Sequence, residues 1–381
     1  MKLELIPVAG NLNRIREIWE NLEAGANTSY FLSWGWIGNW IDSLPDPAKP
    51  ELIVFLEGQK PLLAFFLGKA NLVRKHLFRS RGWFVNATGI PAFDRIYIEY
   101  NGFLCIQPEA FRFVDIIKSL PDSWDEFYLP CLDARSFPGT AALDHIFHFK
   151  TIVDDDLTSP FIDLDRVRTR GGDYLSLLSA NTRSQIHRSY RLCEKTAPVR
   201  LEVARDTQSA LDIYHELVVL HEDTWTKKSK TGAFSSDYLF RFHEQLIQRR
   251  FEYDEIQLLR IKSGDKMLGC LYNFVYKHNV YFYQSGMNYN LDKRLKPGLV
   301  AHVEAIRHNA TAGCKTYDFL GGDSRYKLSL ATDHNRLISV RLQQPLLKFR
   351  IENALKTFKH TLAELRKNVT SAQSRQQEIE P

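Results

Sequence analysis

The stretch from Asn279 to Leu330 constrains the fold most, because its apolar residues change period twice. Aromatic and polar side chains alternate over 280–287, which is typical of a half-buried strand. Helical spacing then begins near Pro297, a residue favoured in the first turn of a helix, and ends at Gly313, which suits a helix C-cap. A second strand over 315–320 ends at a Gly-Gly pair. The stretch therefore predicts a strand, a loop, a helix and a second strand.

The loop ahead of this helix is basic. Lys293, Arg294 and Lys296 stand directly before the helix. The first-turn N–H groups of a helix are unpaired and its dipole adds partial positive charge, so the loop predicts a phosphate site. A solvated basic turn is the alternative, and the neighbouring strands favour the phosphate.

Three motifs in this half resemble the GNAT acyltransferase superfamily. They are Lys296-Pro297-Gly298-Leu299 in the loop, Tyr317-Asp318-Phe319-Leu320-Gly321-Gly322-Asp323 at the second strand, and Tyr326-Lys327 after it. The resemblance is to the branch that contains the Fem-type peptidoglycan aminoacyltransferases and the CelD-like and BioF2-like acetyltransferase domains. The commonest GNAT loop carries two small residues, and here only Gly298 is clearly matched.

This resemblance implies a donor site for acetyl-coenzyme A or another acyl-coenzyme A, without a metal. A backbone N–H of the strand before the loop would stabilise the oxyanion. Tyr326 would protonate the departing thiolate, although a packed aromatic is the alternative. The donor-binding residues implied are Ser285, Gly286, Met287, Arg294, Leu295, Lys296, Pro297, Gly298 and Leu299.

Two residues are candidates for the general base. Asp323 follows the Gly-Gly turn at the end of a strand, a usual location of site residues in α/β sheets. His221 precedes a polar loop that borders the acceptor in GNAT-like folds. Asp318 is expected to be structural, a carboxylate that meets neighbouring backbone N–H groups. The acceptor-binding residues we expect are Trp225, Tyr283, Gly322 and Lys327.

The order of elements in the C-terminal half is repeated in the N-terminal half. Both predict a strand, two helices, several strands, a helix and a strand, and the N-terminal copy includes strands over 82–86 and 96–100. No basic loop precedes its last helix, so we interpret this copy as degenerate. An aromatic stripe over 31–41 is predicted to pack in its core. The predicted fold is α/β (α+β), two tandem GNAT-like domains, each with a mixed, mostly antiparallel twisted sheet flanked by helices.

The predicted boundaries follow from these elements. A degenerate domain occupies 1–150, a linker with an edge strand 151–180, the catalytic domain 181–345, and a C-terminal helix with a disordered tail 346–381. The edge strand is expected near residues 161–164, and the acidic triplet 154–156 in loops.

A basic helix opens the second domain. Arg183, His187, Arg191 and Lys195 are spaced four residues apart and share one face. The face predicts contact with the phosphates of a carrier, a lipid head group or a tRNA, and a solvated helix is the alternative.

Composition excludes several classes of protein. The net charge of +5 does not indicate a DNA-binding protein. Five cysteines without a CxxC pair predict reduced thiols in a cytoplasm, with neither a disulfide framework nor a zinc site. The N-terminus carries no signal-peptide pattern, and no apolar run reaches the roughly 20 residues of a membrane span. We therefore expect a cytoplasmic, bacterial protein without a transmembrane segment.

These observations favour an N-acyltransferase that moves an acyl group from acyl-coenzyme A to an amine. The acceptor would be a small molecule or a glycan, such as an amino sugar or a cell-envelope or exopolysaccharide precursor. One alternative is a Fem-like aminoacyltransferase that uses aminoacyl-tRNA. The other is a non-catalytic binding protein in polysaccharide assembly.

Overall fold

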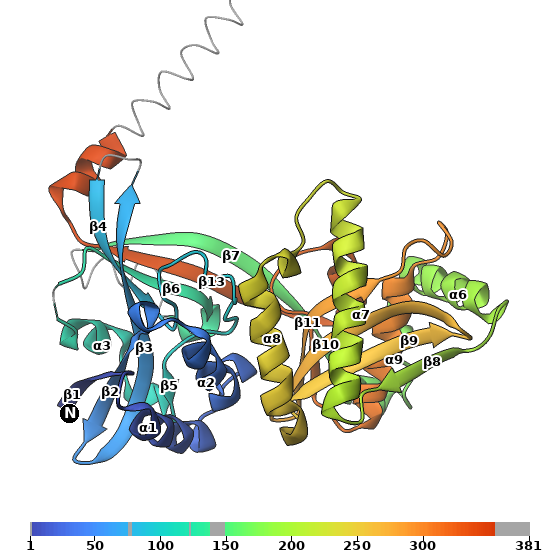
Figure 1. Ribbon diagram of the computed structural model, residues 1–381, viewed down its shortest axis with the longest axis horizontal. Coiled ribbons are helices and arrows are strands. Elements are labelled where there is room, and N and C mark those ends of the chain that lie inside the picture. The colour runs from blue at the N-terminus through green and yellow to red at the C-terminus, as the bar shows by residue number, and fades with distance from the viewer. Residues whose placement is uncertain (1, 75–77, 122, 138–148, 355–381) are drawn as a thin grey trace, which may run out of the picture.

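One sheet of 13 strands forms the frame of the molecule, which a computed structural model describes over residues 2–74, 78–121, 123–137 and 149–354 (Figure 1). The strand order is β1-β2-β3-β4-β6-β13-β7-β12-β11-β10-β9-β8, and β5 pairs with β3. The strands are β1 Lys2–Pro7, β2 Glu51–Glu57, β3 Lys60–Arg74, β4 Phe78–Val85, β5 Leu104–Cys105, β6 Glu126–Asp133, β7 Lys150–Asp163, β8 Val199–Val203, β9 Ile256–Ser263, β10 Lys266–Tyr276, β11 Asn279–Met287, β12 Thr316–Asp318 and β13 Asp333–Gln343. The α-helices are α1 Leu12–Gly25, α2 Trp34–Ser43, α3 Phe113–Ser119, α5 Leu164–Thr169, α6 Ala180–Glu194, α7 Thr207–Thr226, α8 Asp237–Arg250, α9 Pro297–Thr311 and α10 Arg325–Leu330.

The two halves of the sheet have the same arrangement: counted inward from its edge, each half has five strands in the order in which they occur in the chain, β1-β2-β3-β4-β6 and β8-β9-β10-β11-β12. In each half four strands pair antiparallel and the fifth pairs in parallel, β4 with β6 in one half and β11 with β12 in the other. Two helices follow the first strand of each half, α1 and α2 or α7 and α8. This repeat confirms the prediction of two tandem GNAT-like units on a mixed, mostly antiparallel sheet.

The two units exchange their last strands. The strand β7 follows the first unit in the chain but pairs with β12 of the second, and β13 follows the second unit but pairs with β6 of the first. Between these contacts β7 and β13 pair with each other from Phe161↔Asp333 to Lys150↔Gln343. The crossing strands join both units into one sheet.

The expectation of an edge strand near 161–164 and of loops at 154–156 is wrong, because both segments belong to β7, which lies in the middle of the sheet. Its acidic triplet had indicated a loop. In the structure Asp154 pairs with Arg341 and Asp156 with Arg336, both from β13. A cross-strand partner far along the chain makes these carboxylates compatible with a central strand, and local sequence does not show such a partner.

Residues 96–100, predicted as a strand, belong to none of the assigned strands. Ile96 and Ile98 are buried in the core that α1 and α2 form with the sheet. The alternating β-branched residues that indicated a strand therefore belong to an irregular segment that packs on this core. The C-terminal helix and tail predicted over 346–381 fall largely outside the described residues, which include a helical segment over 347–354.

The units also share a hydrophobic core. The ring of Trp36 on α2 lies 5.1 Å from that of Phe242 on α8, and the Asn39 amide donates to the Phe242 carbonyl at 3.1 Å. The aromatic stripe over 31–41 is thus core, as predicted. In Figure 1 the helix α8 faces the first unit across this contact.

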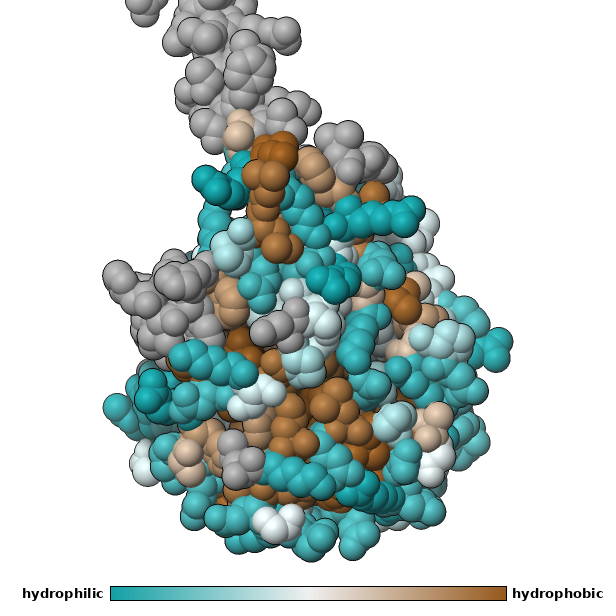
Figure 2. Space-filling model, turned by 90° about the vertical axis from the view of Figure 1, so that its left-hand side faces the viewer, coloured by the Kyte–Doolittle hydropathy of each residue, from teal (hydrophilic) through white to brown (hydrophobic). Residues whose placement is uncertain are grey.

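Apolar side chains also reach the surface of the first unit. Figure 2 shows them gathered in patches on the end of the molecule away from α6. Large apolar side chains that are exposed in this unit and on the helix over 347–354 include Leu5, Val73, Ile106 and Leu347.

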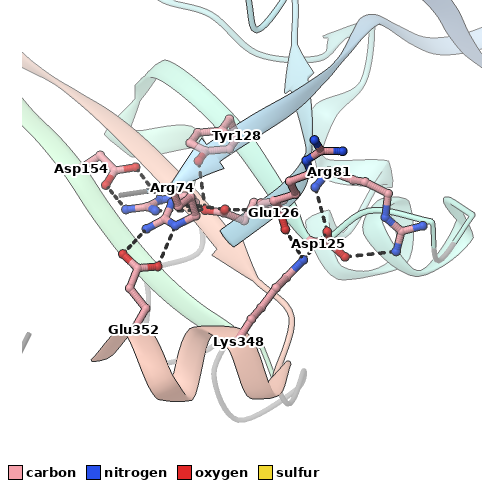
Figure 3. A network of polar contacts seen from close by, with 11 residues as sticks. Arg74, Arg81, Asp125, Glu126, Tyr128, Asp154, Lys348 and Glu352 are labelled. Carbon is pink, nitrogen blue, oxygen red and sulfur yellow. Dashed lines mark hydrogen bonds and ion pairs between the residues drawn. The ribbon is translucent and has the colours of Figure 1, made fainter. Parts of the chain in front are cut away.

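A buried ion network ties the exchanged strand to the first unit (Figure 3). Glu126 on β6 is fully buried and pairs with Arg74 at 2.8 Å and Arg341 at 3.0 Å. The Ser80 hydroxyl also donates to Glu126 at 2.6 Å. Arg74 reaches on to Glu352 at 2.7 Å, so the network also holds the helix over 347–354.

Replacement of Glu126 by Gln will lower the free energy of unfolding by about 3 kcal/mol, because two largely buried guanidinium groups each lose one of their two carboxylate partners and keep only Glu352 or Asp154. Urea unfolding followed by tryptophan fluorescence measures the loss. Glu20→Gln is the control: it removes an exposed pair with Arg16, whose side chain is 57% exposed, and will cost about 0.5 kcal/mol or less. Equal losses in the two variants would contradict a structural role for the network.

Candidate functional site

The parallel strands β11 and β12 separate at their C-terminal ends. They pair only from Asn279↔Thr316 to Tyr281↔Asp318. Beyond Tyr281, β11 continues to Met287. The segment after β12 turns away through Leu320 and Gly322, whose φ angles are +61° and +115°. No described strand pairs with this side of β11 over 282–287, so its backbone groups face the gap. Ligands commonly bind where parallel strands part in this way.

The first turn of α9 lies beside this gap. A β-carbon at Gly298 would come within 3.9 Å of the Met287 side chain and of the Tyr289 hydroxyl. Pro297 occupies the first turn, as predicted. The N–H groups of this turn, which no capping side chain satisfies, lie near the end of β11. The structure thus brings together the two predicted donor segments, 285–287 and 294–299.

Helix α7 fixes the position of β11. A β-carbon at Gly286 would lie 2.2 Å from the Leu217 carbonyl oxygen, so only glycine allows this approach. His221 of α7 donates from Nδ1 to the Ser285 carbonyl at 3.1 Å, and the Ala233 N–H donates to its Nε2 at 3.4 Å. Both ring nitrogens are engaged, and burial lowers the pKa of the ring. This geometry leaves His221 no free nitrogen to accept a proton from an acceptor.

Of the three cations in the loop before α9, one forms an ion pair and, within the described part of the chain, two do not. Arg294 pairs with Asp292 at 2.8 Å, which neutralises part of its charge. Lys293 and Lys296 have no ion-pair partner among the residues that the structure describes, and the Lys296 N–H donates to Ser189 of α6 at 3.2 Å. The basic helix α6 therefore lies against the start of α9.

Tyr326 lies on the α9 side of the gap. Its ring stacks on that of His302 with centroids 5.6 Å apart, and its side chain remains 37% exposed. Burial raises the pKa of Tyr326 to about 12, so the hydroxyl keeps its proton at neutral pH. A protonated and accessible hydroxyl is what a general acid requires.

A buried carboxylate meets the turn after β12. The Glu99 carboxylate, from the first unit, accepts a hydrogen bond from the Gly321 N–H. Burial raises the pKa of Glu99 to about 7, which the positive charge of Lys327 partly opposes. Lys327 donates to the carbonyl oxygens of Gly321 at 2.9 Å and Leu320 at 3.2 Å. The turn thus holds a buried acid and a buried amine together.

Asp318 supports the same turn, as expected for a structural residue. It accepts from the Leu320 N–H at 2.7 Å, from Ser159 at 2.9 Å and from the Tyr100 hydroxyl. Burial raises its pKa to about 6. Tyr100 and Glu99 are adjacent, so this contact places the Glu99 backbone at the end of β12.

The remaining predicted residues lie around the turn. The Tyr283 hydroxyl shares a hydrogen bond with a ring nitrogen of His243 at 3.0 Å, and burial, together with the charge of Glu99, raises the pKa of Tyr283. Gly322 is the turn residue that donates to Thr158 at 2.8 Å. Asp323 is exposed between Gly322 and α10. Trp225 lies at the end of α7, with its ring 5.9 Å from that of His221.

Glu99 was not predicted from the sequence. It stands in a segment that had been assigned to a strand of the degenerate unit, and its partner Gly321 lies 222 positions away. Only the exchange of strands brings the two together. No local motif marks it.

Two further properties concern the described residues alone. Within them no group of three or more His, Cys, Asp or Glu side chains is arranged to hold a metal ion. None of their helices has the length and apolarity that crossing a bilayer requires.

Comparison with known proteins finds a family model over the part of the chain that contains this site. Residues 180–328 match the family model described as an acetyltransferase (GNAT) domain. The crystal structure of FemX is similar in fold, with a TM-score of 0.55 and 10% identity over 89% of this chain and 97% of that one. The C-terminal domain of a putative lysylphosphatidylglycerol synthetase from Agrobacterium fabrum gives a TM-score of 0.51 and 11% identity over 92% and 96%. No curated protein matches the chain.

The pKa of Glu99 predicts a pH-dependent stability. Its folded pKa of about 7 is above the ordinary 4.5, so its contribution is fully present below pH 4.5 and is lost as the pH rises through 7. Glu99→Gln mimics the neutral acid and removes this loss. The unfolding free energy of the native chain relative to the variant will therefore fall by roughly 3 kcal/mol between pH 4.5 and pH 8. Urea unfolding at several pH values measures it, and Glu109→Gln, at an exposed position, will show no such trend.

Proposed function

We propose that this protein is an acyltransferase that moves an acyl group from acyl-coenzyme A to an amine; the match of residues 180–328 to the model of an acetyltransferase (GNAT) domain supports the proposal. The observation that carries the proposal is the gap between β11 and β12, which has Glu99 on one face of the sheet and Tyr326 on the other. The Glu99 charge acts on Tyr283, which packs against the core shared with the first unit. On the other face, His302 contacts Tyr326 and also packs against the rings of Phe282 and Phe319. A base and an acid thus flank an open strand edge.

The donor would lie along β11 with its pyrophosphate at the start of α9. Pro297 has no N–H and the Leu299 N–H donates to the Lys296 carbonyl at 3.1 Å, so within the described residues it is the Gly298 N–H of the first turn, with the charges of Lys293 and Lys296, that favours an anion there. The edge of β11 beyond Tyr281 offers backbone groups to the amide-rich arm of coenzyme A. Ser285, Gly286 and Met287 end this edge, and we assign a backbone N–H of this stretch to the developing oxyanion; the Ser285 N–H itself donates to the Gln284 side chain at 3.0 Å.

In the proposed reaction Glu99 takes a proton from the ammonium group of the acceptor. The free amine attacks the thioester carbonyl carbon, and the N–C bond forms. The C–S bond of the tetrahedral intermediate then breaks, and Tyr326 donates a proton to the coenzyme A thiolate. The amide nitrogen, which still carries one extra proton after the attack, releases it, and this proton returns Tyr326 to its neutral form. Glu99 fills the role that the sequence had assigned to Asp323 or His221, since its pKa of about 7 suits proton transfer near neutral pH.

A polar cleft between the two units supports an amino sugar as acceptor. Its volume is about 430 Å³, and Asp318 and Tyr100 belong to its wall. Amide and hydroxyl groups suited to sugar hydroxyls line it, from Thr28, Ser29, Asn101, Asn279, Thr316 and Asn335. Glu99 is adjacent to Tyr100, so an amine on a sugar in this cleft would lie close to the proposed base.

Aminoacyl-tRNA as donor is the second candidate, and the position of α6 favours it. Arg191 and Lys195 are exposed on this helix, which contacts the proposed phosphate loop through Ser189. Their positive face could extend the donor site to a longer polyanion. Strong salt dependence of tRNA binding, with no binding of acyl-coenzyme A, would establish this candidate over the first.

Substitution of Gly298 tests the donor site. A β-carbon there meets no atom closer than 3.9 Å, so both Asp and Asn are compatible with the fold. Calorimetric titration with acetyl-coenzyme A and longer acyl-coenzymes A will show binding that Gly298→Asp weakens by about tenfold or more through repulsion of the phosphates, whereas Gly298→Asn keeps most of it. Equal affinity in both variants would place the donor elsewhere.

Substitution of Glu99 tests the chemistry. Glu99→Gln will lower kcat by about 10²- to 10⁴-fold. Because the base must be ionised, the rate of the native enzyme will rise with pH through about 7, and the variant will lose this rise. Asp323→Asn is the matched control, since it removes an exposed carboxylate two residues beyond Gly321. A larger loss in Asp323→Asn than in Glu99→Gln would return the role of base to Asp323.

A further inference from the structure

The first unit contains a cavity, open to solvent on one side, that the proposed reaction does not use. Its strands β4 and β6 pair only from Gly82↔Glu126 to Phe84↔Tyr128 and then separate, as β11 and β12 do in the second unit. A cavity of about 240 Å³ lies where they part. Residues 96–98 cover it, and the exchanged strands β7 and β13 complete its wall.

The body of this cavity is apolar and aromatic. The rings of Phe84 and Tyr128 stack with centroids 4.5 Å apart and an angle of 9° between their planes. Ile96 and Ile98 are only 4% and 7% exposed. The side chains that give it this character are Trp40, Phe84, Ile96, Ile98, Tyr128, Leu129 and Val340. Such a wall suits an apolar or aromatic group of a small ligand.

The polar part of the wall is acidic. The Asp94 carboxylate is satisfied by the N–H groups of Thr88 and Gly89, each at 2.8 Å. Asp154 pairs with Arg341 at 2.6 Å. Asp155, in contrast, has no ion-pair or hydrogen-bond partner among the described residues, and its charge acts on the hydroxyl of Tyr97, which also lines the cavity.

Asp155 is an exposed, unpaired carboxylate at the rim of the cavity, so it favours a positive charge there and disfavours a negative one. Among the described residues that line the cavity there is no lysine or arginine. The Arg341 guanidinium lies over the Tyr128 ring at 5.6 Å, and it is paired with Asp154 and Glu126. An ammonium group at the Asp155 end would gain a charge-assisted hydrogen bond, while its apolar body fills the interior. A carboxylate ligand of the same shape would meet repulsion.

We propose that this cavity is a binding site for an organic cation, a small ligand with an ammonium group held by Asp155 and an apolar body held by the Phe84 and Tyr128 rings. The site is separate from the gap between β11 and β12. It therefore does not depend on the proposed acyl transfer.

Calorimetric titration of the full chain with three probes of one shape tests the proposal. The probes are 2-phenylethylamine, which is cationic at pH 7, the neutral 2-phenylethanol, and the anionic phenylacetate. We expect the amine to bind more tightly than the alcohol by about tenfold, and the phenylacetate not to bind. Absence of binding by the amine, or equal binding of all three probes, would overturn the proposal.

Two variants locate the binding. Asp155→Asn will reduce amine affinity by about tenfold and leave the alcohol unchanged, whereas Asp156→Asn, which removes the same charge from the next residue of β7, will leave both unchanged. Ala87→Leu adds volume to the cavity wall and will abolish binding of amine and alcohol. Its thermal unfolding midpoint verifies that it is folded. Amine binding that survives both Asp155→Asn and a folded Ala87→Leu would place the ligand elsewhere and refute the assignment.

Discussion

The pairing of β7 with β13 is the interaction on which the rest of the structure depends. Each strand completes the sheet of the unit to which it does not belong in sequence. Hydrogen bonds of the central ladder therefore connect the two units more firmly than a surface contact would. The buried Glu126 adds electrostatic selection of register, because it meets Arg341 of β13 only in this alignment.

The proposed catalytic centre is a product of this joining. Glu99 belongs to the first unit, yet its carboxylate accepts from Gly321 at the end of a strand in the second unit. Burial between the two units raises its pKa, and the Lys327 ammonium holds the same turn through the carbonyl oxygens of Leu320 and Gly321. A unit that lacks a phosphate loop of its own can in this way still supply a reacting group. The strands and helices of the first unit would then position a reacting group as well as pack against the second unit.

Much of the fold follows from local periodicity. The change of period around Pro297 predicted β11, α9 and β12 within a few residues, and the repeated element order predicted the tandem units. The acidic run in β7 was misassigned because its stabilising partners, Arg336 and Arg341, lie far along the chain. The proximity of segments 285–287 and 294–299, the proposed donor site, was predictable since they belong to one continuous stretch. Glu99 was not, because its environment arises only when distant strands meet.

The strand exchange also limits when each unit can finish folding during synthesis. When the ribosome has completed β6, the outer edge of that strand has no partner, since β13 is about two hundred residues from being translated. An unpaired central strand is a template for association with other chains. The first unit must therefore wait, incomplete, until the end of the second emerges. Cells that make this protein would benefit from chaperones that shield nascent chains during that interval.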